Sequence, residues 1–183
     1  MAPTKSSLRA TGRAAAASLS PEARAAASVE ICGAIKALPE WTGARVIALY
    51  SALASEPDLA SLLDAPGKLF CFPALSGEAM EFHLCEDVSQ LRAGAWKILE
   101  PDARNCPVVA PNEIELLLIP GLAFTVDGKR LGRGGGHYDR FLERAQPRAV
   151  KIGVCFHAQL VAEMPVEIHD REVDRVITER SPR

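Results

Sequence analysis

The residues best suited to chemistry lie in one glycine- and arginine-rich segment, Arg130-Leu-Gly-Arg-Gly-Gly-Gly-His-Tyr-Asp139. Its glycines, Gly132, Gly134, Gly135 and Gly136, allow consecutive backbone N–H groups to converge on one anion, because no Cβ atom obstructs them. Arg130 and Arg133 add forked donors that match phosphate oxygens. The segment lies between a predicted buried strand and a predicted helix, and a helix N-terminus also favours an anion. A flexible surface loop would explain the glycines alone, but with the arginines this context indicates polyphosphate binding.

Two further features fit a bound polyphosphate. Asp139 follows the glycines directly, and a carboxylate beside phosphates requires a cation between them; Mg²⁺ is the ion held by one or two carboxylates and phosphate oxygens. Lys5, Arg9 and Arg13 recur every four residues and form one stripe on a predicted helix. A solvated helix face would explain this stripe equally well, but beside a phosphate loop it is a candidate second wall for a nucleotide.

Helices alternate with apolar strands in the elements that must position these residues. Helices are predicted over residues 5–19, 21–38 and 57–63, and a further one starts at Tyr138. Ser20 is the expected N-cap of the second helix, with Pro21 in its first turn. Its buried face is expected to carry Val29, Ile31, Ile35 and Leu38, and Pro39 is expected to end it.

Strands are predicted over residues 45–50, 68–72, 79–84, 115–119, 150–156 and 175–178. The second is expected to close at Pro73, and residues 86–112, rich in Pro and Gly, are expected to be mostly loop. Several strands are apolar on both faces, which indicates a buried, mainly parallel sheet. We therefore expect an α/β fold, a Rossmann-like three-layer αβα sandwich, as one domain over residues 1–183.

Composition limits the class of protein. The 183 residues are 48% hydrophobic and 24% charged, as in globular proteins, and the net charge of −2 argues against a nucleic-acid partner. The longest apolar stretch, residues 116–124, is too short to span a membrane. The five cysteines form no C-x-x-C pair, so we interpret them as buried small hydrophobes in a reducing compartment.

The residues before Glu22 are rich in Ala, Ser and Arg, a composition that is also typical of mitochondrial transit peptides. Their charges form the stripe described above, however. We therefore expect this segment to belong to the working protein, in the cytoplasm.

With Pro120-Gly-Leu-Ala-Phe124 before it, the segment from Gly128 to Arg140 resembles the signature of the 5-formyltetrahydrofolate cyclo-ligase family, also called 5,10-methenyltetrahydrofolate synthetases. Weaker similarities follow in the family's order along the chain: Lys5-x-x-x-Arg9, Tyr50 to Glu56-Pro-Asp58, Glu100-Pro101, and Asp170-x-x-x-Asp174-Arg-Val-Ile177. Two positions depart from the family habit. Thr125 stands where Asp is common, and His137 where an aromatic ring is usual, beside the expected substrate pocket.

The resemblance implies a reaction in which ATP phosphorylates the formyl oxygen on nitrogen 5 of a reduced folate. Nitrogen 10 then attacks the formyl carbon and phosphate leaves, giving 5,10-methenyltetrahydrofolate, ADP and phosphate. Phosphoryl transfer needs positioning and charge neutralisation rather than a protein nucleophile, so no catalytic Ser or Cys is expected. The expected partners are ATP and 5-formyltetrahydrofolate, with no nucleic acid and no membrane, and the chain is expected to act as a monomer.

The residues and the resemblance together assign site roles. The catalytic residues are Arg130 and Arg133. ATP is expected to contact both arginines, Lys5, Arg9, the four glycines, His137, Tyr138 and Asp139. The folate is expected to contact Tyr50, Glu56, Trp96, Arg133 and His137. Phe72, Met80 and Phe82 could also supply apolar walls for its rings, but burial in the core explains them more simply. Mg²⁺ is expected on Asp139 and Asp170, with Asp174 competing for the second place.

Two other classes of function remain open at this point. One is a nucleotide-sensing protein that keeps the fold without turnover. The other is a sugar-phosphate isomerase on a related α/β fold, which would need no ATP.

Overall fold

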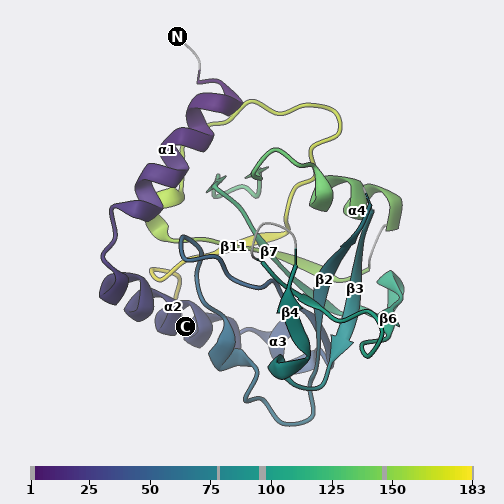
Figure 1. The fold of residues 1–183 in the computed structure, drawn as a ribbon. Helices are drawn as coiled ribbons and strands as arrows, with labels where there is room; N and C mark the ends of the chain where they lie inside the picture. Colours follow the sequence, from purple (N-terminus) through teal and green to yellow (C-terminus); the bar gives the residue numbers. More distant parts are fainter. Residues whose placement is uncertain (1–2, 78, 95–97, 146–147, 183) are drawn as a thin grey trace.

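A seven-stranded sheet forms the centre of the computed structural model, which describes residues 3–77, 79–94, 98–145 and 148–182 (Figure 1). Its order is β11-β10-β7-β1-β2-β3-β6, and the pairings from β11 to β2 are all parallel. Only β3 and β6 join by antiparallel pairing. The strands are β1 Val46–Ala48, β2 Leu69–Ser76, β3 Ala79–Cys85, β6 Val108–Val109, β7 Leu116–Pro120, β10 Val150–Val154 and β11 Arg175–Ile177.

The helices are α1 Lys5–Ala17, α2 Pro21–Lys36, α3 Pro39–Gly43 and α4 His137–Ala145, with short 3₁₀ turns η1 Ala60–Leu62, η2 Val88–Gln90, η4 Pro111–Glu113 and η5 His157–Gln159. Ser20 caps α2 as predicted, since its side chain accepts a hydrogen bond from the backbone N–H of Ala23. The helix predicted over residues 57–63 is reduced to η1. Within the described ranges, no helix is long and apolar enough to cross a membrane.

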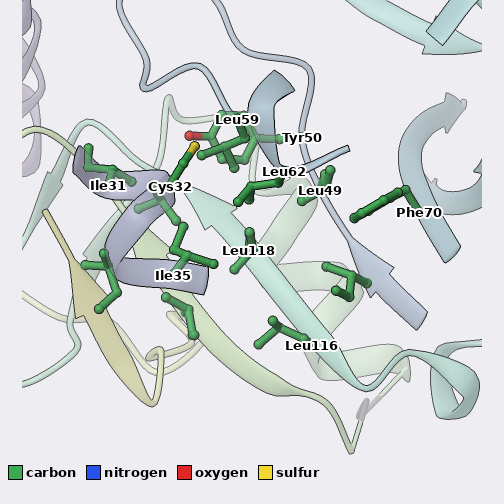
Figure 2. Packing of buried hydrophobic residues seen from close by; sticks show 14 of the residues in the cluster. Ile31, Cys32, Ile35, Leu49, Tyr50, Leu59, Leu62, Phe70, Leu116 and Leu118 are labelled. Atoms are coloured by element: carbon green, nitrogen blue, oxygen red, sulfur yellow. The ribbon is translucent and has the colours of Figure 1, made fainter. Parts of the chain in front are cut away.

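The sheet is covered on both faces, which confirms the expected three-layer αβα sandwich. Successive residues of β7 point to opposite faces. Leu116 and Leu118 pack with Ile31 and Ile35 of α2 (Figure 2), whereas Leu117 and Ile119 join the cluster that contains Phe141 of α4. Each face of β7 lies under a helix, and this explains why the strand is apolar on both faces.

Helix α1 lies apart from α2 and packs at the end of the sheet rather than over its face (Figure 1). Leu8 packs against Ala123 and Leu131, which belong to the small two-stranded sheet β8 Ala123–Phe124 and β9 Arg130–Leu131. Gly12 permits this approach, because a Cβ atom there would lie 2.0 Å from the carbonyl oxygen of Leu122. The basic stripe of α1 is thereby brought beside the glycine-rich segment.

Two further local predictions were wrong. Val29 is 63% exposed, because α2 turns Ile31 and Ile35, not Val29, to the sheet. Strand β2 does not end at Pro73 but continues to Ser76. Strand β1 pairs with β2 only as far as Cys71, so beyond Cys71 β2 pairs with β3 alone. A proline, which has no backbone N–H, is tolerated where one side of the strand is unpaired. Most of the described residues of 86–112 lie outside strands, as expected, although this segment also contains β4 Leu91–Ala93 and β5 Leu99–Pro101, which pair with each other, and β6.

The cysteines are buried and free, as interpreted from the sequence: Cys32, Cys71, Cys85, Cys106 and Cys155. Burial raises the pKa of the Cys71 and Cys85 thiols to about 12. Both thiols therefore stay protonated at neutral pH and are poor nucleophiles.

Candidate active site

A pocket of about 490 Å³ opens where the parallel strands β1 and β7 end. Tyr50 and Ser51 follow β1, and Pro120 and Gly121 end or follow β7; all four line the pocket. The chain leaves β1 to form β2 on one side and returns on the other side as β7, so the two connections diverge at this point. Open α/β sheets commonly bind ligands in such a crevice.

The glycine-rich segment forms one wall of the pocket, with the first turn of α4 directly behind it. Gly134 and Gly136 have φ of +107° and +65°, a backbone region that favours glycine, so the loop needs these residues to turn. Arg9 reaches across from α1, and its Nε donates to the carbonyl oxygen of Gly132 at 3.1 Å. The predicted loop and the predicted basic stripe therefore meet at one place.

Arg130 is fixed at the floor of this wall. Its side chain is 3% exposed and its Nη2 donates to Oδ1 of Asp139 at 2.8 Å. The guanidinium carbon lies 5.5 Å from the centre of the Tyr138 ring, and Nε has no hydrogen-bond partner among the described residues. A buried cation with an unused donor is poised to bind an anion that enters the pocket.

Lys5 and Asp170 meet at another edge of the pocket. The Lys5 Nζ lies 2.7 Å from Oδ2 of Asp170 and 3.3 Å from Oε1 of Glu167. Burial by itself lowers the pKa of the Lys5 amine, but the hydrogen bonds to these two carboxylates outweigh it and raise that pKa above its ordinary value. Lys5 is therefore a permanent cation in this pocket.

Glu56 and Arg133 face each other across the pocket and form an ion pair. The Arg133 Nη2 lies 2.8 Å and Nε 3.1 Å from Oε1 of Glu56, and Nη2 also donates to the Ser55 hydroxyl at 3.2 Å. The side chain of Glu56 is 8% exposed and that of Arg133 is 41% exposed. Two residues that were each expected to contact a substrate thus contact each other.

Two tyrosines lie close to this ion pair. Burial, reinforced by the negative charge of Glu56, raises the pKa of both Tyr50 and Tyr138 above the ordinary value. Both hydroxyls are therefore protonated donors at neutral pH. Tyr50 donates to the carbonyl of Pro57 at 2.8 Å, whereas the buried Tyr138 hydroxyl has no partner among the described residues.

The opposite wall is apolar and was largely missed by sequence reasoning. It is formed by Pro73, Leu75, Met80 and Ile98, with the carboxylate of Glu100 beside them. Leu75 and Met80 are register partners in the β2–β3 pair. The strand alternation would have indicated this shared face, had β2 not been expected to stop at Pro73.

The other predicted residues have varied positions. His137 lines the pocket at the start of α4, with its Nδ1 3.2 Å from Nη2 of Arg140. Arg13 is exposed, and Phe72 and Phe82 are buried in the two core clusters. Trp96 lies outside the described residues. Two titratable pocket residues that were not predicted, Glu167 and His169, precede Asp170 in the same loop.

The two carboxylates expected to hold Mg²⁺ lie at one end of the pocket. Asp139 and Asp170 both line it, and Oδ1 of Asp139 accepts from the backbone N–H of Arg171, the neighbour of Asp170. Asp174 is instead held by Lys151 through Nζ at 2.9 Å and through the backbone N–H, and is not part of the described lining. Among the described residues, there is no group of three or more His, Cys, Asp or Glu side chains that could hold a metal ion.

A pair of carboxylates still fits Mg²⁺, because this ion takes its other oxygen ligands from phosphates and water.

Comparisons with known proteins agree with this geometry. Residues 1–179 match the sequence model of the 5-formyltetrahydrofolate cyclo-ligase family. The 5-formyltetrahydrofolate cyclo-ligase of Mycolicibacterium smegmatis is 31% identical over 159 residues, 80% of this chain and 82% of that protein. A probable 5-formyltetrahydrofolate cyclo-ligase of Schizosaccharomyces pombe is 27% identical over 82% of this chain and 83% of that protein.

A solved structure is also similar. The NMR structure of 5,10-methenyltetrahydrofolate synthetase from Aquifex aeolicus matches with a TM-score of 0.85 and 31% identity, covering 97% of this chain and 90% of that one.

Proposed function

Because the chain belongs to the 5-formyltetrahydrofolate cyclo-ligase family, we propose that it converts 5-formyltetrahydrofolate to 5,10-methenyltetrahydrofolate with ATP as co-substrate. It is thus a ligase of folate one-carbon metabolism. The observation that carries the proposal is the two-sided pocket. A basic, glycine-rich wall suits a polyphosphate, and an apolar wall with a nearby carboxylate suits a flat heterocycle bearing N–H donors.

The basic wall supports a phosphate-binding role for the residues predicted there. Arg130, Arg133, Lys5 and Arg9 line the pocket, and the backbone N–H groups of residues 132–136 would add further donors to the phosphates. The γ-phosphoryl group is transferred to the formyl oxygen on nitrogen 5, and the bond to the β-phosphate oxygen of ATP breaks. Fixed positive charge stabilises this transfer, because negative charge spreads over the phosphoryl oxygens in the transition state.

The apolar wall supports folate binding. Leu75, Met80 and Ile98 would pack against the ring system, with Tyr50 at the carboxyl end of β1. Glu56 would accept hydrogen bonds from the pterin N–H groups. Nitrogen 10 then attacks the activated formyl carbon, and the carbon–oxygen bond breaks as phosphate leaves. Arg133 and His137 also line the pocket, and they would contact both substrates.

Asp139 and Asp170 are the residues that we propose to hold Mg²⁺. The ion would neutralise phosphate charge when bound to ATP. In the structure each carboxylate forms an ion pair with a basic side chain, Asp139 with Arg130 and Asp170 with Lys5. We further propose that residues 1–183 act as one cyclo-ligase domain, as a cytoplasmic monomer without a nucleic-acid or membrane partner.

The test is a spectrophotometric assay of methenyl product from 5-formyltetrahydrofolate. Product should form with Mg-ATP and should be absent without ATP or with a chelator. A nucleotide sensor would bind ATP without turnover, and a sugar-phosphate isomerase would act on its own substrate without ATP. Either result would refute the proposed function.

A further inference from the structure

We propose that the ion pair between Glu56 and Arg133 is a latch that couples the binding of the two substrates, a proposal that rests on the proposed function. In the structure each residue is the ion-pair partner of the other. A nucleotide that draws Arg133 to its phosphates releases Glu56 for the folate, and a folate that engages Glu56 releases Arg133 for the nucleotide.

The contacts show that the latch occupies both partners. The Nε and Nη2 groups of Arg133 both donate to a single oxygen, Oε1 of Glu56, and Nη2 also donates to the Ser55 hydroxyl. The other oxygen, Oε2 of Glu56, accepts from the backbone N–H of Leu53 at 3.0 Å. The pair joins two loops that are 77 residues apart in the sequence and that lie on the two sides of the pocket. Neither side chain is fully available to a ligand while the pair is closed.

Exposure distinguishes Arg133 from its neighbour Arg130. The Arg130 side chain is 3% exposed and is held by Asp139 and by the carbonyl of Pro120. The Arg133 side chain is 41% exposed and stands between Gly132 and Gly134. Arg133 is therefore the arginine of this wall that can change partners without disturbing the buried core.

The energetic balance favours exchange. A half-exposed arginine loses little when its ion pair opens, because water replaces the lost contact. Glu56 differs, since its side chain is only 8% exposed and would be left as a nearly buried carboxylate without a cation. A buried carboxylate without a partner is unfavourable in free energy, and hydrogen bonds from the N–H groups of a pterin ring would stabilise it. Each substrate thus removes a competitor of the other, and coupling between two sites is reciprocal.

The experiment measures the affinity for a non-hydrolysable ATP analogue with Mg²⁺ by calorimetry, with and without saturating 5-formyltetrahydrofolate. In the wild-type protein the folate should tighten nucleotide binding by about two- to fivefold, because the ion pair that it opens is partly exposed. Glu56→Gln should tighten nucleotide binding by a similar factor without any folate, because Arg133 is no longer held. In an Arg133→Ala background, Glu56→Gln should have no such effect.

The matched control is Glu100→Gln. It removes the same charge from the same pocket, but Glu100 forms no ion pair among the described residues. Equal tightening by Glu56→Gln and Glu100→Gln would show a general charge effect and overturn the latch, as would folate-independent nucleotide affinity in the wild type. The wild-type comparison needs no variant to fold. A wild-type protein that bound no nucleotide would refute the proposed function as well, whereas binding and turnover without coupling would overturn the latch alone.

Discussion

The ion pair between Arg130 and Asp139 at the floor of the pocket is the contact whose loss should most damage stability. The two side chains are 3% and 17% exposed, and Nη2 lies 2.8 Å from Oδ1. In Asp139→Ala the guanidinium would keep only the carbonyl of Pro120 at 3.4 Å and the face of the Tyr138 ring, since its Nε is already without a partner among the described residues. A buried cation would remain uncompensated.

Breaking a buried ion pair by removing one partner costs about 3–5 kcal/mol of folding free energy. Because Asp139 borders the pocket and water reaches it, we expect the lower end, about 3 kcal/mol. A domain of this size has a free energy of unfolding of about 5–15 kcal/mol. With a urea dependence of about 2 kcal/mol per molar, the unfolding midpoint should fall by roughly 1.5 M.

The assay is urea unfolding followed by circular dichroism, with two comparison variants. Asp127→Ala breaks the exposed ion pair with Lys129, whose side chains are 58% and 34% exposed, and should cost less than about 1 kcal/mol. Arg130→Met removes the buried charge itself and should destabilise less than Asp139→Ala does. Equally small losses in Asp139→Ala and Asp127→Ala would show that the Arg130 guanidinium is hydrated, and would refute the reasoning.

Further predictions concern ligand contacts and packing. Arg133→Ala should lower kcat by the equivalent of about 2–4 kcal/mol and change either KM less, because its charge acts on the transferring group; near-normal turnover in steady-state kinetics would place Arg133 in solvent. Replacing both Lys5 and Arg9 by Ala should weaken ATP binding far more than folate binding, measured by calorimetry, and equal weakening would contradict a phosphate role. His137→Phe should retain most turnover, because a flat ring is what the position requires; loss of turnover with nucleotide binding intact would show that the imidazole takes part in the chemistry. Gly12→Ala should lower the thermal unfolding temperature, because its methyl carbon would lie 2.0 Å from a backbone carbonyl oxygen, and an unchanged temperature would show that α1 can shift freely.

The sequence by itself determined the features that depend on neighbouring residues. An apolar run such as residues 116–119 must be buried on both faces, and in β7 these residues are. Ser20 before Pro21 caps a helix wherever that helix packs. The glycines at positions 132–136 stand between a strand and a helix, and the loop does line the pocket. Local backbone preference and periodicity suffice for all of these.

Only the tertiary structure decided which distant residues meet. Lys5 and Asp170 are 165 residues apart, and Glu56 and Arg133 are 77 apart. The sequence predicted that each of these residues contacts a substrate or the metal, but not that they form ion pairs with each other. The exposure of Val29 and the passage of β2 through Pro73 likewise depend on which neighbouring element is present. The physical reason is that ion pairing and burial depend on distances in space. These distances are set by how α1, the sheet and the loop after η5 pack together, and spacing along the sequence does not record them.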